Sequence, residues 1–282
     1  MTAGWDAAAA VRIFVGQARV DAVPADDRGL AYGDGLFETM RAHACAVPWW
    51  ERHWARLALG AARLGLALPP EALVRDQAAD LLGDAAGDAV LRLLVTRGRG
   101  RGYAPPAAAR PTWVLSLHPP PPIPARGLRL GWCGTRLALQ PALAGLKHCN
   151  RLEQVLARAA LAAADPQADE GLLRSAGGDV VCATAANLFV FGEAGWATPP
   201  VDRCGVAGVC RGWILETTGA RERRLAVADV ESAQALVLCN AVRGILPVAR
   251  LGGRSWPPHP QVAALQRRLA SAHPAFAALE VP

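Results

Sequence analysis

The stretch LAGLKHCNRLEQVL, residues 143–156, governs the interpretation of this 282-residue chain. It contains Lys147, the single lysine among 30 basic residues, and the others are all arginine. Arginine can replace lysine as a cation, but its guanidinium stays protonated and cannot act as an amine nucleophile. A lysine retained in so arginine-rich a chain therefore points to chemistry that needs an amine, such as imine formation or proton transfer.

The bulk composition predicts a folded protein without membrane spans. Hydrophobic residues make up 52% of the chain and charged residues 19%, which excludes disordered and fibrous proteins. No run of about 18 apolar residues could cross a membrane. Residues 1–12 also lack a basic start followed by a long apolar stretch, so we expect no secretory signal and a cytoplasmic location.

The cysteines and the net charge argue against two common classes of site. The seven cysteines are odd in number and form no C-x-x-C pair, so we expect reduced thiols and neither a metal centre nor a disulfide framework. The net charge of +6 is spread along the chain without an aromatic stripe. It indicates a solvated basic surface or attraction for an anionic small substrate, rather than nucleic-acid binding.

Alternating and helical spacings predict an α+β fold in two domains with a cleft between them. The proline-rich segment 119–124 predicts a stiff linker between a smaller domain, 1–118, and a larger one, 125–282. The first domain is expected to hold strands 11–15, 18–23, 36–45, 89–96 and 112–117 and helices 50–66 and 71–82. The second is expected to hold strands 128–133, 171–174, 180–183, 188–191 and 235–239, helices 151–164 and 208–218, and a helix after Pro260.

The segment around Lys147 resembles the Schiff-base lysine segment of fold-type IV pyridoxal-phosphate enzymes. The likeness is greatest to the aminodeoxychorismate lyase branch, in which a K-H-x-N-R-L-E-Q run is typical. Four other segments resemble the family in the same order: YGDGLFET at 32–39, HWARL at 53–57, AANLF at 185–189 and GVAGVCR at 205–211. The three asparagines of the chain, Asn150, Asn187 and Asn240, all fall in family-like segments.

This resemblance implies a fold-type IV architecture with its active site in the interdomain cleft. It also implies a homodimer and a specific lyase reaction. The reaction is conversion of 4-amino-4-deoxychorismate to 4-aminobenzoate and pyruvate, a step of folate biosynthesis. Lys147, in the larger domain, would bind pyridoxal 5'-phosphate and act as general base. The other residues implied for the cofactor are Arg56, Cys182, Asn187, Val209, Cys210 and Asn240, and those implied for the substrate include Tyr32, Phe37 and Thr39.

Physical chemistry supports the implied phosphate site. Backbone N–H groups at a helix start hold a dianion well, and Val209 and Cys210 would supply them after flexible Gly208. Arg56 would add a planar, bidentate donor for the same group.

The loop RGRGRGY, residues 97–103, admits two interpretations. Arginine–glycine repeats occur in RNA-binding segments, which would suggest a basic binding protein as an alternative to an enzyme. The loop is short, however, and lies between two predicted strands. In the lyases a similar loop occurs at this place, and the substrate has two carboxylates. Arg97 or Arg101 is therefore a candidate anion clamp, and the sequence leaves the choice between them open.

Cys182 departs from the family pattern. Family members usually carry a glutamate five residues before the strand asparagine, here Asn187, where it pairs with the pyridine nitrogen of the cofactor. A thiol would not keep that nitrogen protonated, so the ring becomes a poorer electron sink. This harms transamination more than a reaction driven by aromatisation of its product. The lyase is therefore favoured over a branched-chain or D-amino acid aminotransferase of fold type IV, and a catalytically weak relative is the remaining alternative.

Overall fold

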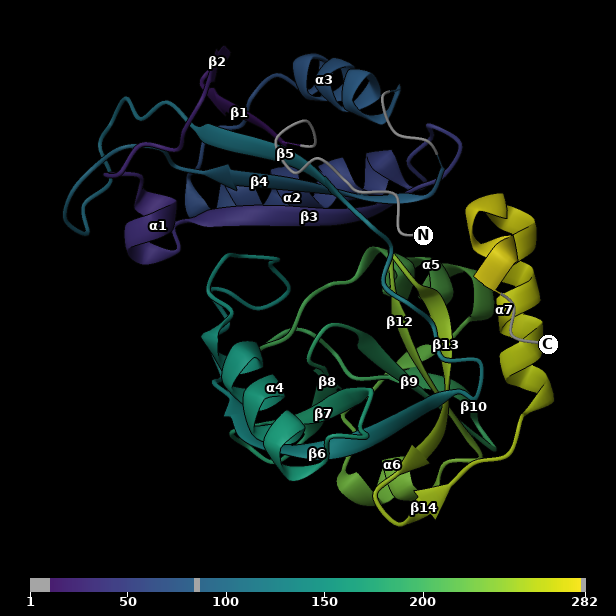
Figure 1. Cartoon of the computed structure of the whole chain (residues 1–282). Coiled ribbons are helices and arrows are strands. Elements are labelled where there is room, and N and C mark those ends of the chain that lie inside the picture. Colours follow the sequence, from purple (N-terminus) through teal and green to yellow (C-terminus); the bar gives the residue numbers. More distant parts are fainter. Residues whose placement is uncertain (1–10, 84–86, 280–282) are drawn as a thin grey trace. The chain divides into compact units, whose positions relative to one another are not determined.

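The computed structural model describes residues 11–83 and 87–279, which divide into two compact units (Figure 1). Unit 1 runs to Pro120 and also contains Lys147–Asn150. Unit 2 contains Pro121–Leu146 and the chain from Arg151 onward. The change of unit at Pro120 lies within the proline-rich segment 119–124. Most of the N-terminal segment in which no secretory signal is expected, residues 1–10, lies outside the described residues.

Unit 1 is built on a five-stranded antiparallel sheet with the order β2-β1-β5-β4-β3. The three strands β3, β4 and β5 are buried along most of their length. Its strands are β1 (Val11–Val15), β2 (Ala18–Val20), β3 (Gly35–Ala42), β4 (Ala89–Thr96) and β5 (Thr112–His118). Its helices are α1 (Arg28–Tyr32), α2 (Trp50–Leu64) and α3 (Glu71–Gly83).

Helix α2 packs against β3, the edge strand that carries the residues of greatest interest (Figure 1). Its buried side chains His53, Leu57 and Ala61 recur at helical spacing and form one face. The helix ends at Gly65, whose left-handed backbone (φ 59°) lets its N–H bond to the carbonyls of Ala61 and Ala62.

The strands of unit 2 close into a ring. β9, β12, β13, β6, β7 and β8 pair in this order, and β8 pairs back with β9. Leucine and valine side chains from these strands fill the interior. The strands are β6 (Leu128–Leu137), β7 (Glu170–Ser175), β8 (Val180–Ala183), β9 (Asn187–Gly192), β10 (Gly195–Thr198), β11 (Arg221–Glu222), β12 (Ala235–Asn240), β13 (Gly244–Leu251) and β14 (Arg254–Ser255).

Helices cover the outside of this ring. α4 lies over β6 and β7, where Ala157 and Leu161 pack with Cys133 and Cys182 in a second apolar cluster. The helices of unit 2 are α4 (Leu152–Ala164), α5 (Val209–Thr218), α6 (Val227–Ser232), α7 (Pro260–Ala272) and the 3-10 helix η1 (Pro274–Leu279).

The chain has the expected α+β fold, and the structure corrects several of the expected elements. β2 ends at Val20, three residues before the expected end, and β3 stops at Ala42 because Ala44 and Cys45 adopt positive φ in a turn. Strand β13 was not expected at all. Within the described residues, no helix is long and apolar enough to cross a membrane.

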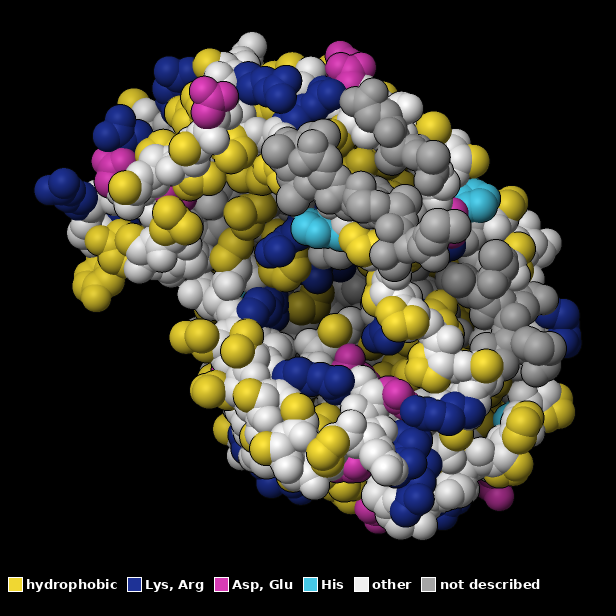
Figure 2. All heavy atoms as spheres, viewed as in Figure 1, with side chains coloured by type: hydrophobic (Ala, Val, Ile, Leu, Met, Phe, Trp, Pro, Cys, Tyr) yellow, Lys and Arg dark blue, Asp and Glu magenta, His cyan; other side chains and the backbone are white. Residues whose placement is uncertain are grey.

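The charged side chains of the described residues do not form a single basic strip on the face shown in Figure 2. Blue lysine and arginine side chains there are interleaved with hydrophobic and acidic ones. In the same part of the chain, no group of three or more His, Cys, Asp or Glu side chains could hold a metal ion.

Candidate active site

Lys147 belongs to a short segment that lengthens the edge of the unit 1 sheet. The N–H of Phe37 donates to the carbonyl of Lys147 (3.0 Å), and the N–H of Cys149 donates to the carbonyl of Gly35 (2.9 Å). These bonds fix the backbone on both sides of the lysine. Its Nζ lies 4.2 Å from the centre of the Phe37 ring, a cation–π distance. Phe37, predicted to contact substrate, therefore lies directly beside the predicted catalytic amine.

A buried charged cluster lies on β3 and α2. Glu38, 1% exposed, accepts hydrogen bonds from Arg56 through both carboxylate oxygens, with the Nε bond at 2.8 Å. Nδ1 of His53 lies 2.6 Å from the same carboxylate. Burial alone would raise the pKa of Glu38, but the Arg56 charge and the His53 hydrogen bond outweigh it and lower the pKa to about 2. Glu38 is thus an anion that fixes the direction of the Arg56 guanidinium.

His53 is buried between charged groups. Burial lowers its pKa and outweighs the opposite effect of Glu38, while Arg56 and Lys147 lower it further. The neutral ring must carry its proton on Nδ1, because the Glu38 carboxylate can only accept. Within the described residues, Nε2 of His53 has no hydrogen-bond partner although it is buried. Nε2 of His53 is therefore a buried hydrogen-bond acceptor that is available to a ligand. The Lys147 charge is close enough to affect the pKa of His53.

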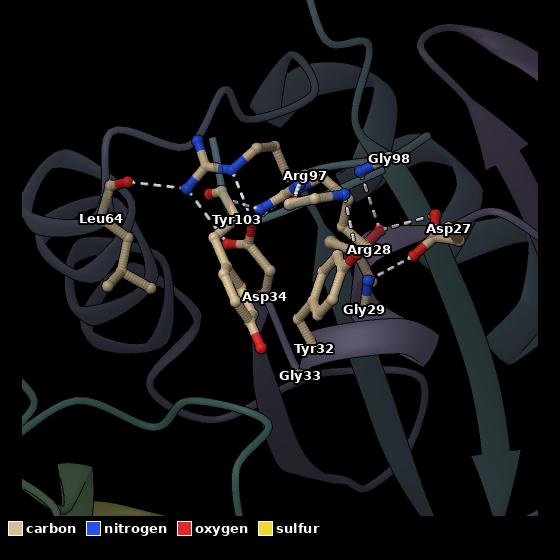
Figure 3. Close-up of polar contacts among 12 residues, drawn as sticks. Asp27, Arg28, Gly29, Tyr32, Gly33, Asp34, Leu64, Arg97, Gly98 and Tyr103 are labelled. Atoms are coloured by element: carbon tan, nitrogen blue, oxygen red, sulfur yellow. Dashed lines mark hydrogen bonds and ion pairs between the residues drawn. The ribbon is translucent and has the colours of Figure 1, made fainter. Parts of the chain in front are cut away.

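Arg97, one of the two candidate anion clamps, is committed to a structural network (Figure 3). Its Nε and Nη2 donate to the two oxygens of Asp34 at 2.7 and 3.1 Å. Its other bonds reach the carbonyls of Leu64 and Gly65 at the end of α2. Arg28 donates to Asp34 from the opposite side at 2.8 Å. Asp34 therefore orients Arg97, and Arg97 ties the loop 97–103 to α2 and acts as a C-terminal cap of that helix.

The outer part of the same loop is exposed. Nη1 of Arg28 donates to the carbonyl of Gly102 (2.6 Å), and the N–H of Gly102 donates to the hydroxyl of Tyr32 (2.8 Å). Tyr103 is 89% exposed, and its ring lies 5.6 Å from that of Tyr32. Arg101 is exposed and, among the described residues, makes no hydrogen bond or ion pair. Hydrogen bonds thus fix the start of the loop at Arg97, whereas the Arg101 side chain is exposed to solvent.

Unit 2 contains a second group of predicted site residues around Asn187. Its Nδ2 donates to the carbonyl of Val206 (2.9 Å), and Gly145 pairs with Val206 across an isolated bridge. A Cβ at Gly208 would collide with Oδ1 of Asn187, so this position requires glycine. The turn 205–208 is therefore fixed both by Asn187 and by Gly145, which precedes Lys147 by two residues in the sequence.

Helix α5 begins at this turn with the features of an anion site. Val209 and Cys210 are its first two residues, and both are buried. Gly208 provides no side chain to cap the helix, and the first turn contains no acidic residue. In the part of the chain that the structure describes, no side chain therefore caps the N–H groups at the positive end of this helix dipole.

Cys182 lies on β8, opposite Asn187 in the register of the strands. It is 7% exposed and packs in the apolar cluster with Cys133 and Leu161. Burial raises the pKa of this thiol to about 12, so it stays neutral. The residue that stands at the expected glutamate position therefore carries no charge.

The remaining predicted residues are Asn240 and Thr39. Nδ2 of Asn240 donates to the carbonyl of Ala185 (3.2 Å), and its Oδ1 accepts from the N–H groups of Val242 and Arg243. Asn240 thus shapes the turn after β12.

Thr39 lies on β3, half-buried like Phe37 and two residues away, so both point to the same face.

Sequence reasoning assigned no role to Glu38, His53 or Asp34. Glu38 gave a usable signal, since it is an acidic residue at a buried position of a strand. Asp34 gave none, because its partner Arg97 is 63 residues away and only the fold brings them together.

Comparison with known proteins adds a family and named relatives. Residues 35–251 match the model of the amino-transferase class IV family. An aminodeoxychorismate lyase of Vibrio harveyi is 34% identical over 242 residues, covering 80% of this chain and 86% of that protein. A putative branched-chain-amino-acid aminotransferase of Methanocaldococcus jannaschii is 30% identical over 81% of this chain and 82% of its own length. The crystal structure of 4-amino-4-deoxychorismate lyase from Pseudomonas aeruginosa superposes with a TM-score of 0.84 at 41% identity, covering 93% of this chain and 99% of that one.

Proposed function

Because the chain belongs to the class IV aminotransferase family, we propose that it is a pyridoxal-phosphate enzyme, and that it converts 4-amino-4-deoxychorismate to 4-aminobenzoate and pyruvate. The observation that carries this proposal is Lys147, the only lysine of the chain, whose backbone is bonded to β3 and whose Nζ lies against Phe37. The named lyases at 34% and 41% identity support the choice of substrate. We further propose that the enzyme acts in the cytoplasm.

The residues present fit the cofactor. The start of α5, which has no side-chain cap and no acidic residue in its first turn, would suit a phosphate dianion held by backbone N–H groups. The family resemblance implies that Arg56, whose guanidinium is oriented by Glu38, would also donate to a phosphate. Asn187 and Asn240 fix the turns on which the cofactor would rest.

Pyridoxal phosphate, when bound, supplies an aldehyde carbon for an amine and a ring that withdraws electrons. Lys147 would hold the cofactor through Nζ, and in its free form the same amine would act as a general base. It removes the proton from ring carbon 4 of the substrate. As the bond to the enolpyruvyl oxygen breaks and the ring becomes aromatic, the same amine gives a proton to the departing methylene carbon. Phe37, whose ring lies 4.2 Å from Nζ, would help to position this amine beside β3.

Two structural features support details of this assignment. The neutral Cys182 thiol suits a reaction driven by aromatisation better than a transamination, although the aminotransferase relative keeps transamination as the second candidate. We propose Arg101 as the clamp for a substrate carboxylate, since Arg97 is bonded to Asp34 and to α2. Arg101→Gln should then raise KM about tenfold with little change in kcat, and an unchanged KM would exclude this role.

The direct test is to mix cofactor-loaded protein with 4-amino-4-deoxychorismate and to measure 4-aminobenzoate and pyruvate together. Equal release of both products is the expected result. If neither product forms while borohydride still fixes the cofactor to the protein, the lyase proposal fails and the cofactor proposal stands. Amino-acid and keto-acid pairs then test for transamination.

We also propose that the protein is a homodimer. Leu152, Val155 and Leu156 of α4 are 74%, 58% and 61% exposed, and their spacing places them on one face of the helix. Exposed apolar faces of this kind mark protein interfaces. Light scattering should give twice the chain mass of 29.6 kDa, and Leu152→Glu with Leu156→Glu should shift the protein toward monomer. A monomeric wild-type protein with full activity would rule the dimer out.

A further inference from the structure

A basic cavity lies in unit 2 where the start of β6 meets the loop between α4 and β7. Its volume is about 630 Å³, within the range of about 300–1,000 Å³ typical of small-molecule sites. Four arginines and a single carboxylate line it: Arg126, Arg129, Arg158, Arg243 and Asp169. Prolines on either side, including Pro121, Pro122 and Pro124, give it a stiff wall.

The carboxylate of this cavity is already neutralised. Both oxygens of Asp169 accept from Arg126, at 2.8 and 3.0 Å, and one also accepts from the N–H of Arg129 (2.7 Å). Burial alone would raise the pKa of Asp169, but these bonds outweigh it and lower the pKa. Asp169 and Arg126 therefore form an ion pair, and the three further arginines, with Glu170 beside one of them, leave the cavity with a net positive charge.

Arg243 is the least hydrated of these three groups. Its side chain is 14% exposed, and burial is the main cause that lowers its pKa. The nearest carboxylate oxygen, on Glu170, is 3.9 Å from Nη2, beyond hydrogen-bond distance. Glu170 uses its other oxygen to accept from Thr184 and from the N–H of Gly171. Among the described residues, the Arg243 guanidinium thus has an electrostatic neighbour but no hydrogen-bonded counter-ion.

Arg129 and Arg158 likewise have no carboxylate within hydrogen-bond distance among the described residues. Arg129 is half-buried on β6 and Arg158 is exposed on α4. Neither guanidinium makes a hydrogen bond or ion pair with another residue in the part of the chain that the structure describes. Holding three cations around one cavity costs free energy unless an anion enters it, because they repel one another and the least exposed of them, Arg243, also loses hydration.

We propose that this cavity binds a small oxyanion with at least two negative charges, a polyphosphate or polycarboxylate, through Arg129, Arg158 and Arg243. Guanidinium groups match the planar, bidentate geometry of phosphate and carboxylate oxygens. Nothing in this site depends on Lys147 or on the lyase reaction, so the two proposals stand or fall separately.

Calorimetric titration of cofactor-loaded protein with inorganic pyrophosphate tests the site, and a parallel titration with citrate identifies the preferred group. Using loaded protein keeps the cofactor's own phosphate position filled. We expect saturable binding of one anion per chain, weakened about tenfold by Arg243→Gln and by Arg129→Gln. Arg243→Lys should also weaken it, since an ammonium keeps the charge but not the bidentate geometry.

Arg268→Gln on α7 is the matched control, because Arg268 is exposed and does not line the cavity. It removes the same charge from the same unit and should change the affinity less than twofold. Equal weakening in this control, or no saturable binding of either anion, would overturn the proposal. If Arg243→Gln fails to fold, as judged by circular dichroism, Arg129→Gln and Arg158→Gln test the site instead. Unchanged affinity in both of these variants would overturn the proposal.

Discussion

Replacing Lys147 with arginine is expected to abolish 4-aminobenzoate release, by about a thousandfold or more, and to prevent borohydride from fixing the cofactor to the protein. Arginine preserves the positive charge beside Phe37, so the electrostatic surroundings of His53 change little. It removes the amine that can both bond to the cofactor and transfer a proton. Product formation and the visible absorbance of bound cofactor, measured on the same sample, report the two losses separately.

Arg92→Lys is the matched control for this variant. Arg92 lies on β4 with its guanidinium 5.1 Å from the centre of the same Phe37 ring, so the change places a second amine near that ring. This variant should retain activity. The double variant, with Lys147→Arg added, should be as inactive as the single one, because an amine on β4 lacks the backbone anchoring of Lys147. Wild-type turnover in Lys147→Arg would contradict the proposed function as a whole.

The sequence was most informative about elements with a regular pattern. The strand expected over 89–96 matches β4 residue for residue, since its apolar run is bounded by polar segments. Strand β13 was missed because Gly244 and Pro247 argue against a strand. The structure accommodates Pro247 because pairing of β13 with β6 begins only at Val248.

Long-range polar pairs could not be predicted in the same way. The motifs placed Lys147, Arg56 and Arg97 in family-like segments, but spacing alone cannot tell which arginine serves a ligand and which serves the fold. Arg97 bonds to Asp34 because the pairing of β3 with β4 places these residues side by side, and it reaches Leu64 because α2 ends beside the β4–β5 loop. Glu38 and Arg56 are 18 residues apart and meet only because α2 packs on β3.

Glu38→Gln is expected to destabilise the protein by about 3–5 kcal/mol and to loosen the cofactor. The carboxylate is the counter-charge of Arg56 and the hydrogen-bond acceptor of His53, and all three side chains are buried or nearly so. A neutral amide leaves the Arg56 charge uncompensated in a poorly hydrated site, which is the costly way to break a buried pair. Urea titration measures the stability, and equilibrium dialysis measures the cofactor affinity, which should fall because Arg56 is no longer oriented.

The pH dependence of the same pair of proteins separates a charge effect from a packing effect. The pKa of Glu38 is lowered from 4.5 to about 2 in the folded state, so its ionised form stabilises the fold fully above pH about 4.5. That contribution is lost as the pH falls toward about 2. The stability difference between wild type and Glu38→Gln should therefore shrink across this window. Glu51→Gln on α2 is the control, since Glu51 is 79% exposed and its ion pair with Arg75 (3.4 Å) is worth little. A Glu38→Gln deficit that stays constant from pH 5 to pH 2 would show that side-chain packing, and not the buried charge, holds Arg56 in place.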